Sequence, residues 1–209
     1  MKKVFKILGY FLLGLLIIAL LAGIFFFVKW NRVSTANLKL LGVEAPTLAV
    51  NNYSFRDLNK NGQIDVYEDG RATIENRTND IMNQMTLEEK AGLLFITMIG
   101  MNRDGSLSEI PSLNEPMTFM LESNSSMVAK KKMNHFNIIQ ATSPKAMATW
   151  NNNLQKLAER TRLGIPVTIA TDPRHIAQEN AGASIPTPFF SKWPSPLGFA
   201  ASELSNCLL

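Results

Sequence analysis

The longest apolar stretch of the chain runs without a break from Gly9 to Val28, over 20 residues. A helix of that length is about 30 Å long, which matches the hydrocarbon core of a bilayer, so the pattern predicts a transmembrane helix at 9–28. The alternative is a cleaved secretory signal, but the apolar region of such signals is usually about 7–15 residues long. No small-residue cleavage site follows, because Val28 leads directly into Lys29 and Trp30. The pattern favours an uncleaved anchor.

The basic residues around this run predict its orientation. Residues 1–8 carry Lys2, Lys3 and Lys6, whereas only Lys29 and Arg32 follow the run closely. The excess of positive charge lies on the cytoplasmic side of such helices. We therefore expect residues 1–8 in the cytoplasm and the rest on the extracytoplasmic side of a bacterial cell membrane. Residues 29–54 show no clear period and are interpreted as a tether.

Helical spacing returns after residue 72. Thr73–Met85 has an apolar stripe, and a second helix is predicted after Thr86, because Glu89 three residues later completes a capping box. Another helix is predicted after Ser143-Pro144, a capping serine followed by a proline in the first turn. The predicted core face of that helix consists of Met147, Trp150, Leu154, Leu157 and Ala158.

Three short apolar runs between these helices read as strands. They are Leu93–Gly100, His135–Gln140 and Val167–Thr171. Strands that alternate with helices predict an α/β fold with a parallel sheet, here an incomplete (β/α)8 TIM-type barrel over 72–209. The segment Met101–Lys132 is rich in Ser, Asn, Pro and Gly, and a loop of this length is either functional or poorly ordered.

Composition excludes several classes of site. The net charge is +4, but five of the 21 basic residues lie in the first 32, which leaves 16 basic against 17 acidic residues. The basic run Lys130–Lys132 lacks aromatic neighbours, so a solvated loop is favoured and no nucleic acid is expected as a partner. The single Cys207 excludes an intrachain disulfide, and His135 and His175 cannot form a His-rich zinc site.

One motif points to a cation. The stretch from Asp57 to Glu68 matches the calcium-loop pattern D-x-[DN]-x-[DN]-G-x5-E at every specified position. Oxygen ligands at this spacing suit Ca2+, and a structural role is expected because no second loop is present to pair with it. The segment before the loop does not read as the entering helix, so an Asn-Gly turn whose acids cap the next helix remains an equal alternative. The candidate ligands are Asp57, Asn59, Asn61, Gln63 (by its backbone carbonyl), Asp65 and Glu68.

Several separate motifs carry a family likeness. "DLNKNGQIDVYEDGR", "MTLEEKAGLLF", "NHFNI", "WNNNLQKLAERTRLGIPVTIATDPRH" and "FSKWPSPLGFAAS" follow one another in this order. Together, from about Asp57 to Ala201, they resemble the amino-terminal part of bacterial glycoside hydrolase family 3 enzymes, the β-glucosidase and exo-β-glucosidase group. The resemblance implies a (β/α)8 barrel followed by an α/β sandwich domain, and retaining hydrolysis of β-linked glucosides or oligosaccharides without an organic cofactor.

The resemblance also assigns a substrate site. In the family, an Asp at the end of an early barrel strand holds hydroxyls of the first glucosyl unit, and Asp172 in "DPRH" matches it. Arg174 and His175 are expected beside it, with Arg174 either orienting Asp172 or binding sugar. From the residues alone, Asp172 would be a helix cap after a strand.

The resemblance stops before the catalytic carboxylates. The family's nucleophile Asp and acid/base Glu lie beyond the region that this chain matches, so we expect the chain alone to be inactive. Such an incomplete barrel would leave core faces uncovered and be poorly stable alone. A frameshift or a fragmentary gene is one explanation. The alternative is a non-catalytic, membrane-anchored protein that binds calcium or sugar.

Overall fold

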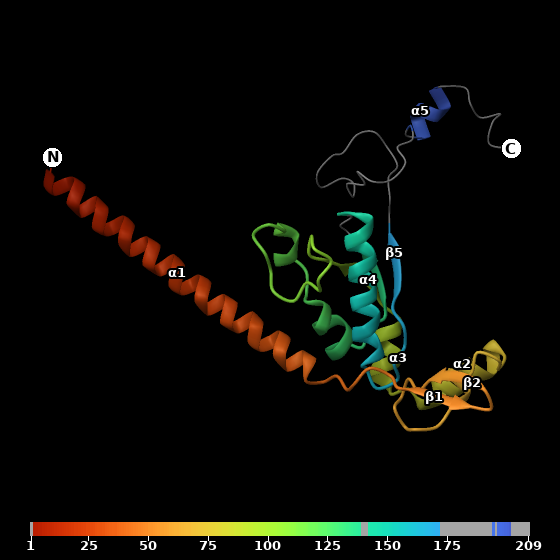
Figure 1. The fold of residues 1–209 in the computed structure, drawn as a ribbon. Helices are drawn as coiled ribbons and strands as arrows, with labels where there is room; N and C mark the ends of the chain where they lie inside the picture. The colour runs from red at the N-terminus through yellow and green to blue at the C-terminus, as the bar shows by residue number, and fades with distance from the viewer. Residues whose placement is uncertain (1, 139–141, 172–193, 195, 202–209) are drawn as a thin grey trace.

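A small parallel sheet lies at the centre of the domain, in a computed structural model that describes residues 2–138, 142–171, 194 and 196–201 (Figure 1). Its strands are β3 (Ile96–Ile99), β4 (His135–Ile138) and β5 (Thr168–Thr171), in the order β3-β4-β5. All neighbours are parallel. The three predicted strands and the α/β class are therefore confirmed. Within the described ranges the sheet is open and no closed barrel is formed.

The three helices predicted after residue 72 form, namely α2 (Ile74–Gln84), α3 (Leu87–Leu93) and α4 (Pro144–Glu159). A further short helix is α5 (Pro196–Ala201). The Thr86 hydroxyl accepts the backbone N–H of Glu89 at 3.2 Å, and the Glu89 carboxylate accepts the N–H of Thr86 at 2.9 Å. The Ser143 hydroxyl accepts the N–H of Ala146 at 3.2 Å. The capping box and the Ser-Pro start are thus confirmed.

The main core lies between α4 and the sheet. Four of the five predicted core residues of α4 are buried, and Met147 is partly buried against them. Side chains from β3, from the segment between β3 and β4, from β4 and from α4 meet there. They are Ile99, Met127, Val128, Phe136, Ile138, Trp150, Leu154 and Leu157. Helical spacing therefore identified the buried face correctly, because burial of apolar area stabilises the packing of helix on sheet.

The long segment between β3 and β4 is ordered and packed. It contains η2 (Pro116–Phe119) and the single π-helical turn η3 (Ser126–Lys130), and Met127 and Val128 of η3 belong to the core. Its length and composition suggested a loop because these short turns have no long hydrophobic period.

Residues 29–54, interpreted from the sequence as a tether, contain regular structure. Helix α1 (Lys2–Leu38) continues ten residues past Val28, and β1 (Thr47–Val50) pairs with β2 (Tyr53–Arg56) as an antiparallel hairpin. The two turn residues, Asn51 and Asn52, have φ of 50° and 66°, the left-handed values that a tight hairpin turn needs. No simple period marked this segment because its parts are short.

Helix α1 is long and apolar enough to cross a membrane over Lys3–Leu38, with a mean hydropathy of 3.0 in its most apolar stretch. In the part of the chain that the structure describes, it is the one helix with this property. Its most apolar stretch has no buried residue. Length and composition fit both an anchor and a signal sequence.

The sheet leaves apolar side chains uncovered on its β3 side. Leu94, Phe95, Ile96 and Met98 are 85%, 61%, 63% and 55% exposed. As expected for an open part of a larger α/β architecture, this edge lacks a covering layer among the described residues.

Replacing Leu154 tests the packing of α4. Leu154 is fully buried, so Leu154→Ala should lower the free energy of unfolding by about 2–5 kcal/mol through lost burial and a residual cavity. Urea denaturation of the chain in detergent measures this change. The matched control, Leu87→Ala, alters a side chain that is 78% exposed and should change stability by less than about 0.5 kcal/mol. Equal effects of both variants would contradict the described core.

Candidate functional site

The candidate calcium loop begins directly after β2, at a buried carboxylate. Asp57 is 1% exposed, and its two oxygens accept the backbone N–H groups of Asn61 at 3.1 Å and Gly62 at 2.8 Å. Gly62 has φ of +79°, a conformation that glycine adopts without strain. The turn at Gly62 therefore forms as the motif predicts, although the loop is entered from a strand.

The end of the loop folds back onto its beginning. Glu68 lies in η1 (Val66–Glu68), and its Oε1 accepts the N–H groups of Leu58 at 2.6 Å and Asn59 at 3.1 Å. Its Oε2 accepts the N–H of Asp65 at 3.1 Å, which caps the short helix. The carboxylates of Asp57 and Glu68, the first and last acids of the motif, thus both accept hydrogen bonds from backbone N–H groups of the loop.

Asp65 collects the amide side chains of the same loop. Its Oδ2 accepts Nδ2 of Asn59 at 2.8 Å and Nδ2 of Asn61 at 2.7 Å, and its Oδ1 accepts Nε2 of Gln84 at 3.2 Å. Gln63 donates its backbone N–H to Oδ1 of Asn61 at 2.8 Å. Of the six candidate ligands, the side chains of Asn59, Asn61 and Asp65 are joined to one another, and Gln63 joins through its backbone. The carboxylates of Asp57 and Glu68 accept backbone N–H groups of the loop instead.

As it stands, this arrangement is a hydrogen-bonded turn. Each carboxylate of the loop accepts N–H donors, and no group of three or more His, Cys, Asp or Glu residues in the described ranges is arranged around a metal position. The residue types still fit a hard cation. Rotating the amides of Asn59 and Asn61 would exchange their nitrogens for oxygens, which would then face the Asp65 carboxylate and a shared cation.

The loop is fastened to the end of α4. The Lys60 ammonium donates to the carbonyl oxygens of Leu58, Glu159 and Thr161, and Arg56 forms an ion pair with the Glu159 carboxylate. Burial lowers the pKa of Lys60, and the negative charges of Glu159, Asp57 and Glu68 oppose this shift. The lysine thus joins a carbonyl of the loop to two carbonyls at the end of α4.

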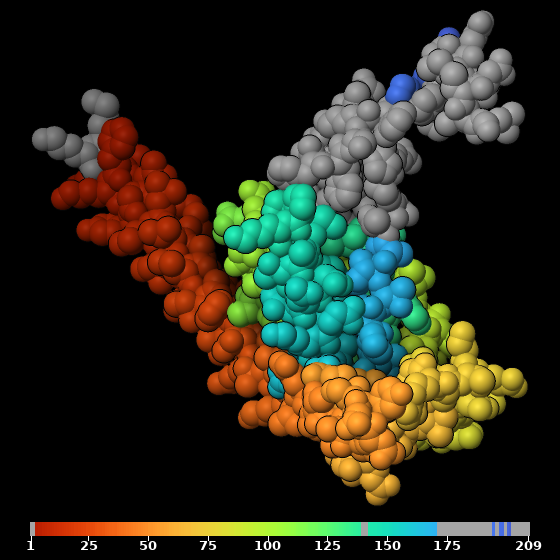
Figure 2. Space-filling view, turned by 45° about the vertical axis from the view of Figure 1, so that its right-hand side comes forward, coloured from red at the N-terminus to blue at the C-terminus, as the bar shows by residue number. Residues whose placement is uncertain are grey.

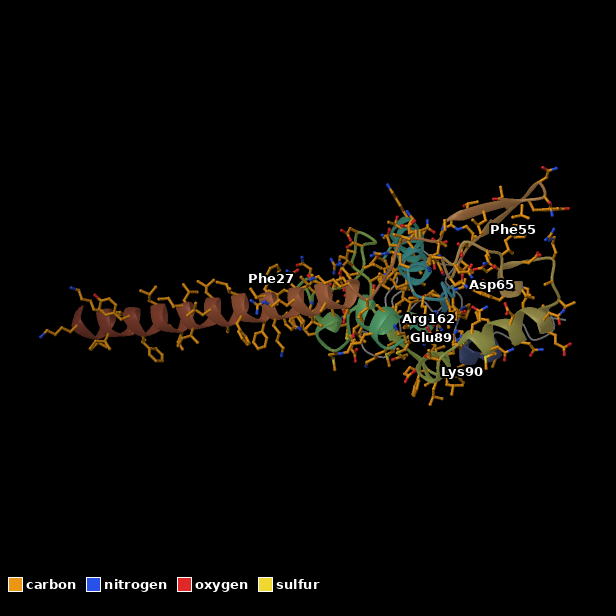
Figure 3. The ribbon with its side chains drawn as sticks, turned by 90° about the horizontal axis from the view of Figure 1, so that it is seen from below. Phe27, Phe55, Asp65, Glu89, Lys90 and Arg162 are labelled. Atoms are coloured by element: carbon orange, nitrogen blue, oxygen red, sulfur yellow. The ribbon has the colours of Figure 1, made fainter. Side chains whose placement is uncertain are left out.

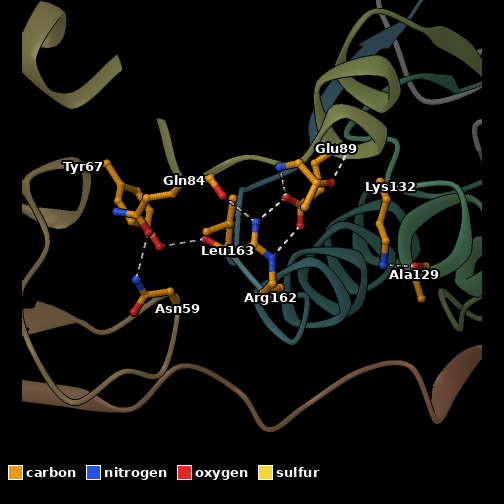
Figure 4. Close-up of polar contacts among 9 residues, drawn as sticks. Asn59, Tyr67, Gln84, Glu89, Ala129, Lys132, Arg162 and Leu163 are labelled. Carbon is orange, nitrogen blue, oxygen red and sulfur yellow. Dashed lines mark hydrogen bonds and ion pairs between the residues drawn. The ribbon is translucent and has the colours of Figure 1, made fainter. Parts of the chain in front are cut away.

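Two further contacts join this region to the connection between α4 and β5, and Figure 4 shows the first of them, between Tyr67 and Leu163. The Tyr67 hydroxyl donates to the carbonyl of Leu163 at 3.1 Å, and burial raises the pKa of this phenol. Gly164 has φ of +59°, and a Cβ there would lie 2.8 Å from the carbonyl oxygen of Leu58. A larger residue at 164 would therefore push the loop away from α4.

Arg162 links the same region to α3. Its Nε donates to Oε1 of Glu89 at 3.0 Å, and its Nη2 donates to the carbonyl of Gln84 at 2.8 Å. Burial alone would raise the pKa of Glu89, but the hydrogen bonds from Arg162 and from the Thr86 N–H outweigh it and lower the pKa. This pair holds α2 and α3 against the chain that enters β5.

The loop lies at one edge of the sheet, and β5 ends at the other. The end of α4 and the start of β5 mark the amino-terminal edge, and β1, β2 and α2 lie below it (Figure 1). Strand β5 ends at Thr171 at the opposite, carboxyl edge. Asp172, Arg174 and His175 follow Thr171 but lie outside the described residues, so their positions remain predictions. The loop is therefore well placed for a structural role.

The carboxyl edge is braced by a residue that sequence reasoning missed. Asn124 is fully buried; its Nδ2 donates to the carbonyl of Gly100 at 3.1 Å, and its Oδ1 accepts Nε1 of Trp150 at 3.1 Å and the N–H of Ser108 at 3.1 Å. Lys60, which is partly buried, was missed as well. A polar residue in a loop-like segment gives no local signal of burial.

Comparison with known proteins gives one consistent group of relatives. A periplasmic β-glucosidase/β-xylosidase from Dickeya chrysanthemi is 41% identical over 159 residues, which cover 75% of this chain and 23% of the relative. Probable β-glucosidase C from Aspergillus oryzae is 41% identical over 143 residues, 68% of this chain and 21% of the relative. β-Glucosidase C from Emericella nidulans is 38% identical over 146 residues, 69% and 22% respectively. No protein-family model matches the chain. The chain spans about a fifth of the length of these curated relatives.

Removing the Lys60 ammonium tests the attachment of the loop. Lys60→Met keeps the length of the side chain but leaves three carbonyls without their donor, so we expect a loss of about 1–3 kcal/mol in the free energy of unfolding. Chemical denaturation of the chain in detergent gives this value. Lys130→Met, at an exposed position, is the matched control and should be nearly neutral. A neutral Lys60→Met would show that the loop is held by other contacts.

Proposed function

We propose, because the chain is homologous to the β-glucosidases of glycoside hydrolase family 3, that it supplies the first barrel strands and part of the sugar site of a β-glucoside hydrolase. In this proposal β3, β4 and β5 are consecutive parallel strands of a (β/α)8 barrel. The substrates are β-linked glucosides or oligosaccharides. The proposal rests on about 40% identity over about 70% of the chain.

The observation that carries the proposal is the direction of the three strands. Because β3, β4 and β5 are parallel, their carboxyl ends lie at the same edge. Active sites of (β/α)8 enzymes are built at that edge. Asp172 follows the last residue of β5, so a carboxylate there is available to accept hydrogen bonds from two hydroxyls of a glucosyl unit. Arg174 and His175 complete the proposed subsite.

The proposed reaction is retaining hydrolysis. One carboxylate attacks the anomeric carbon and forms a glycosyl-enzyme, while a second carboxyl group protonates the leaving oxygen and later activates water. Neither of these two groups is assigned to this chain. Its own contribution is to bind and orient the sugar ring, which places the glycosidic bond against the catalytic pair. We therefore expect no turnover by the chain alone.

The proposed location is the extracytoplasmic face of a bacterial membrane, with α1 as a single-pass anchor. Two observations support retention of α1 over cleavage. Ser34 and Asn37 near its end are only 7% and 4% exposed, and Oγ of Ser34 donates to Oε2 of Glu109 at 2.8 Å. Cleavage after the apolar run would remove most of α1 and leave only its packed carboxyl-terminal end attached to the domain.

We also propose a structural Ca2+ in the loop from Asp57 to Glu68. The residue types support it, because the loop offers three carboxylates and two asparagine amides at the spacing of the motif. Binding would require these side chains to exchange their present N–H donors for the cation. The cation would replace amide donors around Asp65 and hold the loop closed against α4. The alternative, a turn closed by its own hydrogen bonds, needs no cation.

A chimera tests the proposed enzyme. Residues 1–201 of this chain are fused to the downstream part of the Dickeya relative, and hydrolysis of a nitrophenyl β-glucoside is measured. We expect the chimera to be active and the chain alone to be inactive. Asp172→Ala should lower kcat/KM of the chimera at least about a hundredfold, because about 3 kcal/mol of charge-assisted hydrogen bonding to the sugar is lost.

Glu88→Ala, which removes an exposed carboxylate on α3, is the matched control and should leave kcat/KM unchanged. Circular dichroism verifies that each variant folds. Turnover by the chain alone, or equal kcat/KM for Asp172→Ala and the parent chimera, would contradict the proposal.

Calcium binding is tested separately by thermal unfolding of the chain in detergent, with Ca2+ or with a chelator. If the loop binds Ca2+, the cation at about 100 times its Kd should stabilise the fold by about 2.7 kcal/mol. Asp57→Asn should abolish this Ca2+-dependent difference, whatever its own effect on stability. The same unfolding curve with Ca2+ and with chelator would favour the hydrogen-bonded turn.

A further inference from the structure

The segment Leu113–Met120, which includes η2, presents large apolar side chains to the outside. Leu113, Met117, Phe119 and Met120 are 87%, 44%, 48% and 80% exposed. Four such residues within eight positions form an apolar surface of the kind that marks an interaction site.

Two of the three polar residues of the same segment, Glu115 and Thr118, are turned inward, whereas Asn114 is exposed. Thr118 is 2% exposed; its hydroxyl donates to the carbonyl of Glu115 at 2.6 Å and accepts the N–H of Ser112 at 2.9 Å. Glu115, the one acid of the segment, is 8% exposed and forms an ion pair with Arg103. Hydrogen bonds and an ion pair thus hold Thr118 and Glu115 inside, while the large apolar side chains of the segment remain outside.

This apolar segment is fixed to the end of α1. The rings of Trp30 and Phe119 lie edge to face, with centroids 5.8 Å apart. Nearby, Oγ of Ser34 donates to Oε2 of Glu109 at 2.8 Å, and Nδ2 of Asn37 donates to Oγ of Ser125 at 3.5 Å. The position of Phe119 along the axis of α1 is therefore set by direct contacts.

Trp30 marks the level of the membrane surface. It follows Val28, the last residue of the apolar run, by two positions, and tryptophan prefers the boundary between headgroups and acyl chains. Lys29 and Arg32 on either side of it are exposed and can meet lipid phosphates. A segment packed on Trp30 must therefore lie at the same boundary.

We propose that Leu113–Met120 inserts into the interfacial layer of the phospholipid bilayer that α1 crosses. The inference rests on the proposed function only in that α1 is retained as an anchor. The ring contact with Trp30 favours lipid over a protein partner, because it makes the apolar surface continuous with the transmembrane helix. In Figure 2 the green segment lies between α1 and α4, on the side of the domain that faces the helix.

The insertion also orients the domain. The segment belongs to the connection that leaves the carboxyl end of β3, the edge where the sugar site is proposed. Anchoring through both α1 and Leu113–Met120 holds that edge close to the membrane surface. The candidate calcium loop points away, since Asp65 and Phe55 lie at the opposite side of the domain from Phe27 (Figure 3).

Depth-dependent quenching tests the insertion. The full chain with Cys207→Ser receives one cysteine at a time, Met120→Cys, Leu113→Cys, Ile74→Cys or Leu20→Cys, labelled with an environment-sensitive fluorophore. Each variant is reconstituted into phosphatidylcholine–phosphatidylglycerol vesicles that carry a nitroxide either near the carbonyl end or near the methyl end of the acyl chains. Ile74 is the matched control, because it is 82% exposed on the remote helix α2.

We expect labels at 113 and 120 to be quenched most strongly by the shallow nitroxide, the label at 20 by the deep nitroxide, and the label at 74 by neither. If the label at 20 is quenched but those at 113 and 120 behave like that at 74, the insertion is wrong and the anchor stands. A blue-shifted but unquenched label at 120 means that protein covers the segment, which also overturns the inference. Absence of quenching at 20 overturns the anchor and the insertion together.

Discussion

The buried amide of Asn124 connects three segments that are far apart in the sequence. It binds the carbonyl of Gly100 at the end of β3, the N–H of Ser108 in the following segment and the indole N–H of Trp150 on α4. A buried amide is stabilising only when its donors and acceptor are satisfied, so these bonds fix one arrangement of sheet, segment and helix. Glu109 in that segment then holds Ser34, and through it the end of α1. The relation between the domain and α1 therefore depends on the packing around Asn124.

Under the proposed function, the two edges of the parallel sheet have different tasks. At the amino-terminal edge, Lys60 and Tyr67 attach the loop of Asp57 to the end of α4, and this contact is structural. At the carboxyl edge, β5 leads into Asp172, where homology to β-glucosidases supports a sugar-binding role. The exposed side chains of Ile96 and Met98 on β3 are the surface on which further barrel strands would pack. This division agrees with (β/α)8 enzymes, in which one face provides stability and the other chemistry.

Much of the fold could be predicted because its signals are local. Thr86 with Glu89 and Ser143 with Pro144 mark helix starts by short-range hydrogen bonding, and the spacing of Trp150 and Leu154 identifies a buried face. The hairpin before Asp57 and the ordered segment after β3 could not be predicted, because long-range partners determine them. The motif of the calcium loop predicted the turn at Gly62. The carboxylates of Asp57, Asp65 and Glu68 accept N–H groups and, in the described part of the chain, are not grouped around a metal position, so the calcium site stays a prediction.

The central claim is that a sugar binds at the carboxyl edge of the sheet, where β5 ends. An experimental structure of the chimera with bound glucose tests it most directly. The account predicts glucose beyond Thr171, with two of its hydroxyls within hydrogen-bonding distance of the Asp172 carboxylate and the loop of Asp57 on the far side of the sheet. Glucose at the amino-terminal edge near Lys60, or glucose without a contact to Asp172, would contradict the account.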